Sequence, residues 1–156
     1  MKQGVYLFIL SLLIIACSHY DDLNKNGKES EANSSESHNS GQNCMTCHNR
    51  GEFDEAVVEG GWWNIAGTVY NTNGTTPASE GSIELWTGPG RTGKFVYKLP
   101  IDAKGNFYTA KVVDFKGGFY PVLLDKDGNV KKKMDNKTST GACSSCHGVI
   151  EDKIAF

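Results

Sequence analysis

The sequence contains two copies of the pattern C-x-x-C-H, and no other feature constrains the chain as strongly. The copies occupy residues 44–48 and residues 143–147. In each copy two thiols are three positions apart, and a histidine directly follows the second thiol. Because the chain has four histidines among 156 residues, a histidine after both pairs is expected by chance in roughly one sequence in a thousand.

This pattern is the one that attaches a c-type haem to a protein. In the first copy, Cys44 and Cys47 can each add to one vinyl group of a porphyrin, and His48 can become the proximal ligand of its iron. The second copy can supply the same three bonds through Cys143, Cys146 and His147. The two motifs therefore predict two covalently bound haem c groups.

Two other uses of the paired cysteines are open at this point. The four cysteines could form a zinc site, or each pair could form a local disulfide in an exported domain. The cysteine pairs of a zinc ribbon are usually about 15–20 residues apart, whereas the two pairs here are much farther apart. The haem interpretation is favoured for this reason.

The N-terminus has the features of a bacterial lipoprotein signal. An apolar run over residues 5–15 is shorter than the roughly 20 residues that a transmembrane helix needs. It leads into Leu-Ile-Ile-Ala-Cys, ending at Cys17, which resembles the lipobox of bacterial lipoproteins. The resemblance implies that residues 1–16 are a signal peptide and that Cys17 is acylated; an ordinary signal peptide cleaved near Ala16 is the alternative. Removing Cys17 from the five cysteines leaves two complete motifs.

An acylated Cys17 predicts a protein anchored in a lipid bilayer of the bacterial cell envelope. Ser18 favours the outer membrane by resemblance to lipoprotein sorting signals, and the periplasmic and surface faces are both open. Covalent attachment of haem takes place outside the cytoplasmic membrane, so the expected location and cofactor agree. A net charge of −2 gives no indication of binding to nucleic acid.

Residues 17–43 are rich in Ser, Asn, Glu and Asp. Such a segment buries too little apolar surface to offset the entropy of ordering, which predicts a disordered tether. His38 lies within it, either as a solvated residue of the tether or as a distal haem ligand.

Met134 is the better candidate for a distal ligand. It lies in a polar segment nine residues before Cys143, where a methionine has no core to fill. Methionine opposite histidine raises the reduction potential of a haem, whereas a second histidine leaves it lower. If Met134 and His38 serve different irons, the two haems are expected to differ in potential.

Residues 62–130 alternate between short strand patterns and turn signals. Strands are expected over 64–70, 81–86, 94–99, 106–112 and 119–124. This spacing, with Gly-rich turns, predicts an all-β fold, an antiparallel Greek-key-type β-sandwich. Trp62 and Trp63 precede the first strand and are expected either in the core or against a porphyrin face.

The order of the fragments Gly-Thr-Val-Tyr at 67–70, Gly-Ser-Ile-Glu-Leu at 81–85 and Asp-Ala-Lys-Gly-Asn-Phe at 102–107 resembles the carboxypeptidase-regulatory-like or transthyretin-like (prealbumin) β-sandwich. That resemblance implies a scaffold or adhesive module without catalysis. The haem-binding segments 44–61 and 131–156 are too small to enclose a haem alone. We expect them to be short irregular or helical segments that fold back on each other or on the sandwich.

Taken together, the sequence resembles a lipid-anchored dihaem c-type cytochrome. The expected function is electron transfer with other redox proteins of the cell envelope, without enzymatic chemistry. One alternative is a haem peroxidase or gas sensor with an open iron site. Another is a surface-binding β-sandwich without haem, in which the C-x-x-C pairs are disulfides or zinc ligands.

Overall fold

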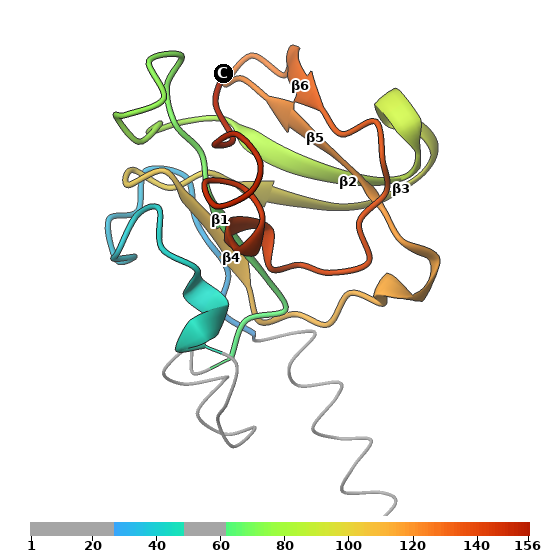
Figure 1. The fold of residues 1–156 in the computed structure, drawn as a ribbon, viewed down its shortest axis with the longest axis horizontal. Coiled ribbons are helices and arrows are strands. Elements are labelled where there is room, and N and C mark those ends of the chain that lie inside the picture. Colours follow the sequence, from blue (N-terminus) through green and yellow to red (C-terminus); the bar gives the residue numbers. More distant parts are fainter. Residues whose placement is uncertain (1–26, 49–61) are drawn as a thin grey trace, which may run out of the picture.

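The computed structural model describes residues 27–48 and 62–156, which form two antiparallel sheets (Figure 1). The strands are β1 (Ile65–Thr68), β2 (Ser82–Gly88), β3 (Thr92–Pro100), β4 (Asn106–Thr109), β5 (Tyr120–Leu124) and β6 (Val130–Lys133). Strands β1 and β4 form one sheet, and the other has the order β3-β2-β5-β6. Short 3₁₀ turns connect or flank them: η1 (Cys44–Thr46), η2 (Pro89–Arg91), η3 (Phe115–Gly117) and η4 (Cys143–Ser145). The prediction of an all-β, antiparallel fold is confirmed.

The hydrophobic core lies between the two sheets. Ile65 of β1 and Phe107 of β4 pack with Ile83, Leu99 and Leu123 of the larger sheet, and none of the five is more than 4% exposed. Burial of each such side chain stabilises the fold by roughly 1.5–3 kcal/mol. Side chains from the facing sides of the two sheets therefore close the interior of the sandwich.

Strand β6 extends the sandwich beyond residue 130, where the predicted body ended. Its sequence is Val-Lys-Lys-Lys, and all four residues are exposed, so hydrophobic periodicity gives no strand signal there. It is a strand because β5 has an open edge, on which Leu123 pairs with Lys132. Lysines on an edge strand also disfavour pairing with another chain.

Residues 27–43, for which composition predicts a disordered tether, lie against the sandwich. The Ser30 N–H donates to the Tyr108 carbonyl at 2.9 Å, beside the free edge of β4. Farther along, the Asn106 side-chain amide donates to the His38 carbonyl at 3.2 Å. The free edge of β4 offers backbone partners, and these hydrogen bonds offset part of the entropy lost by a polar segment.

Residues 1–26 and 49–61 lie outside the described residues. The predicted signal peptide, the acylation of Cys17 and the end of the first haem segment therefore stay predictions. The described ranges contain no helix that is both long enough and apolar enough to cross a membrane.

Candidate cofactor-binding site

Both C-x-x-C-H motifs lie against strand β1. Turn η1 opens the first motif and η4 opens the second, and β1 contacts both turns. The Ala66 N–H donates to the Gly141 carbonyl at 2.9 Å, which aligns the second motif along the strand. Cys44 is close enough to contribute electrostatically to the raised pKa of Cys143. Two motifs that are far apart in the sequence thus meet on one strand.

The two motifs have the same backbone turn. The Cys44 carbonyl accepts hydrogen bonds from the N–H groups of Cys47 at 3.2 Å and His48 at 2.9 Å. In the second motif the Cys143 carbonyl accepts from Cys146 at 3.3 Å and from His147 at 3.0 Å. Residues three and four positions apart share one face of a helical turn. Each motif therefore places its two cysteines and its histidine within one turn of the backbone.

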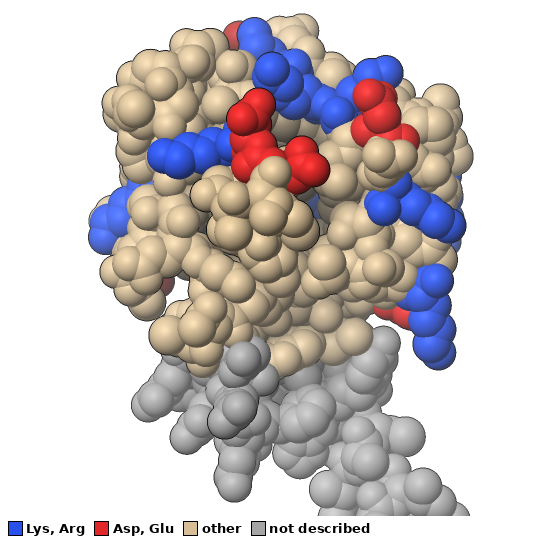
Figure 2. Space-filling view, viewed as in Figure 1, with Lys and Arg blue, Asp and Glu red and all other residues tan. Residues whose placement is uncertain are grey.

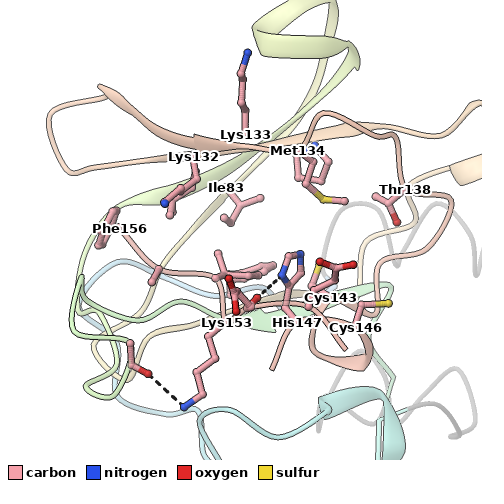
Figure 3. Close-up of a pocket in the computed structure, with 18 of the residues that line it drawn as sticks. Ile83, Lys132, Lys133, Met134, Thr138, Cys143, Cys146, His147, Lys153 and Phe156 are labelled. Carbon is pink, nitrogen blue, oxygen red and sulfur yellow. Dashed lines mark hydrogen bonds between the residues drawn. The ribbon is translucent and has the colours of Figure 1, made fainter. Parts of the chain in front are cut away.

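The second motif lines a cavity of about 650 Å³. This volume lies within the range of about 300–1,000 Å³ that is typical of small-molecule sites. Cys143, Cys146 and His147 lie on one side of the cavity and Met134 on the other (Figure 3). The apolar side chains that also line it are Ile83, Phe107, Leu123, Ile154 and Phe156. We call this arrangement of Cys143, Cys146, His147 and Met134 the second site.

The His147 ring has one nitrogen committed and one available. Its Nδ1 lies 2.8 Å from the Asp152 carbonyl oxygen. A carbonyl only accepts, so Nδ1 carries the proton and donates it, and Nε2 keeps its lone pair for a metal. Histidines that bind metals commonly make such a bond, which orients the ring. The sequence contains no signal for this backbone partner, so sequence reasoning missed Asp152.

Met134 reaches the cavity because the β5–β6 pairing continues past β6. Its N–H donates to the Pro121 carbonyl at 3.0 Å, which holds the residue beside β5. Its thioether faces the cavity across from His147. The residue selected from a polar sequence context therefore lies in the same cavity as the second motif.

The first motif has a different set of neighbours. The rings of His38 and His48 have centroids 5.8 Å apart. An iron bound by two imidazole nitrogens at about 2.0–2.1 Å each would hold the centroids roughly 6 Å apart. The two imidazoles are therefore neighbours, as two histidine ligands of one iron would have to be. We call Cys44, Cys47, His48 and His38 the first site.

Trp63 is a second neighbour of the His48 ring. The ring centroid of Trp63 is 5.1 Å from that of His48. The backbone N–H of Trp63 donates to the His48 carbonyl at 3.0 Å. Trp63 is buried and also packs on Tyr108, with centroids 4.6 Å apart. The side chain is thus a core residue that also fixes the position of His48.

The four cysteines of the two motifs are free thiols in the described residues. No group of three or more His, Cys, Asp or Glu side chains there is placed to hold a metal ion. A haem iron needs at most two protein ligands because the porphyrin supplies the other four, so this criterion does not apply to haem.

Burial gives the thiols unequal reactivity. It raises the pKa of the Cys143 thiol to about 12 and also raises the pKa of Cys44, whereas Cys47 is exposed. Because the thiolate is the nucleophile, iodoacetamide at pH 8 should alkylate Cys47 much faster than Cys143 in the haem-free protein. The rate at Cys143 should rise steadily up to about pH 11, below its raised pKa.

Peptide mass spectrometry after timed alkylation measures these rates, and in denaturant all the thiols should react alike. Equal labelling of Cys47 and Cys143 in the folded chain at pH 8 would contradict the packing of the half-buried Cys143 against the core.

Gly141 sets the contact between the second motif and β1. A Cβ there would overlap the Asn64 carbonyl oxygen and come within 2.8 Å of the Ile65 Cα. Gly141→Ala is therefore expected to lower the free energy of unfolding by about 1–3 kcal/mol, as measured by urea denaturation. Gly117→Ala is a matched control, because nothing lies within 4 Å of its added Cβ, and it should change stability by less than about 0.5 kcal/mol. Equal effects would contradict the close approach.

No known protein-family model matches this sequence, and it has no significant match among curated proteins or solved structures. The functional assignment therefore depends on the residues and geometry of the two sites.

Proposed function

We propose that this protein is an electron carrier that binds two covalent haem c groups. The observation that carries the proposal is that both C-x-x-C-H motifs adopt the same turn, in which the carbonyl of the first cysteine accepts hydrogen bonds from the N–H groups of the second cysteine and of the histidine. A repeated turn of this kind is what covalent attachment and axial ligation of one haem require of five residues.

The second site has the residues that a haem needs. Cys143 and Cys146 would form the thioethers, and His147 Nε2 and the Met134 sulfur would be the axial ligands. When bound, the haem supplies an iron that gains and loses one electron. The apolar side chains that line the cavity would cover part of the haem, and methionine ligation would raise its reduction potential.

The first site is the lower-potential site in this proposal. His48 and His38 are its candidate axial ligands, and a second histidine leaves the potential lower than methionine does. Trp63 holds the His48 ring by stacking and by its backbone hydrogen bond. Both motifs contact β1, which favours electron exchange from the first site to the second.

The proposal includes anchoring at an acylated Cys17 and exchange of electrons with other redox proteins of the bacterial cell envelope. Covalent attachment of haem c outside the cytoplasmic membrane supports this location. The protein would then need no substrate chemistry of its own, since its residues hold and tune the two irons.

The test is a pyridine haemochrome spectrum with a haem-to-protein ratio, on protein produced with the haem c maturation machinery. We expect about two covalent haems per chain. A ratio near zero would reject the proposal and return attention to the sandwich surface. Carbon monoxide binding by the reduced protein would instead indicate an open iron site.

A further inference from the structure

One lysine lies on the core-facing side of the larger sheet. Leu99, Ile83, Leu123 and Lys132 are paired in that order across β3, β2, β5 and β6. Residues paired across strands direct their side chains to the same face. The first three are core residues, so Lys132 continues an inward-facing row at the edge of the sheet. There it lines the cavity of the second site.

The neighbouring lysines of β6 have other positions. Lys133 pairs with Val122 on the opposite face, its Nζ lies 4.0 Å from the Asp135 carboxylate, and its ammonium extends away from Cys143, Cys146 and His147. The Lys131 Nζ lies 3.9 Å from the Asp125 carboxylate. Basic side chains gather on this edge of the molecule, where β6 lies (Figure 2).

The Lys132 side chain has no ion pair or hydrogen bond within the described residues. The other charged residues that line the cavity are Lys133, Glu151, Asp152 and Lys153. Of these, Lys153 is already occupied, since its Nζ donates to the Gly74 carbonyl at 3.3 Å and lies 4.4 Å from the Tyr70 ring centroid. Lys132 is thus an inward-facing ammonium that has no partner in this part of the chain.

We propose that Lys132 binds a propionate carboxylate of the haem held at the second site. This inference rests on the proposed function. The two vinyl groups and the two propionates of a haem lie on opposite edges of the porphyrin. Cys143 and Cys146 lie at one end of the cavity, and Lys132 lies with Phe156 at the other. A haem attached by its vinyl edge to the cysteines therefore extends its carboxylate edge toward Lys132.

The consequence is a higher reduction potential at the second site. A positive charge that neutralises a carboxylate stabilises the reduced iron relative to the oxidised iron, which carries one more positive charge. Removing that charge should lower the potential. The size of the change depends on distance and burial, so a lysine on the other face of the sheet should have a smaller effect.

The experiment is a potentiometric titration of the full haem-loaded protein. The second-site transition is identified as the one that disappears when Cys143 and Cys146 are both replaced by alanine. Lys132→Gln should shift its one-electron equilibrium constant toward oxidation about threefold, and Lys132→Glu about tenfold, which is 59 mV. Lys132→Arg should keep the native potential. Lys133→Gln, with the same change in net charge, should shift the equilibrium constant by less than about 1.5-fold.

Resonance Raman spectra give a second readout, because the propionate bending vibration should move in Lys132→Gln and not in Lys133→Gln. Equal shifts in potential for the two glutamine variants, with an unchanged propionate vibration, would overturn the inference while leaving the proposed function intact. A wild-type chain without covalent haem would instead overturn both.

Discussion

Replacing both Cys143 and Cys146 by alanine is expected to lower the covalent haem content from about two per chain to about one. Each motif supplies its own thioethers, and the first motif reaches β1 through a separate turn. The loss should therefore be confined to the second site. The pyridine haemochrome spectrum measures haem content, and the weak far-red absorption band typical of histidine–methionine ligation should vanish with it.

Replacing Cys44 and Cys47 provides the reciprocal experiment. Haem content should again fall to about one per chain, but the far-red band should persist because Met134 lies in the cavity of the second motif. Ser145→Ala is a control within the second motif, since it removes a hydrogen bond to the Ala142 carbonyl and leaves both thiols. An unchanged haem content in either cysteine variant would exclude that motif as an attachment site.

Met134→Ala is expected to keep the haem content while abolishing the far-red band. The second-site potential should fall by on the order of 0.1 V, a fraction of the roughly 0.8 V range that axial ligands span. The vacant axial position should also allow carbon monoxide to bind the reduced protein. Met134→His should restore six-coordination at a low potential, because histidine stabilises the oxidised iron more than methionine does.

Met45 provides a matched control. It lies inside the first motif and packs with the cluster formed by Trp63, Ala66 and Ala110, away from the cavity that Met134 lines. Met45→Leu should therefore leave the far-red band and both potentials unchanged. If Met45→Leu abolished the band and Met134→Ala did not, the ligand assignment would be wrong.

Local sequence was sufficient for the strands whose side chains alternate. Ile83 and Leu85 are buried in β2, as their spacing predicts, and the turn before β4 has Gly105 at a φ of +81°, which glycine adopts without steric cost. Local sequence was insufficient for β6 and for residues 27–43. Both are polar segments that gain backbone partners from strand edges, and a hydrophobic pattern carries no information about an edge elsewhere in the chain.

In the candidate sites, too, the local sequence determined one part and the tertiary structure determined the other. Each C-x-x-C-H motif forms its turn locally, because the hydrogen bonds that close the turn join residues three and four positions apart. The neighbours of each imidazole were decided by the tertiary structure. Met134 faces His147 through the β5–β6 pairing, and His38 lies beside His48 because its segment packs on β4. Contacts between distant residues depend on how strands pair, and strand pairing has no local signature.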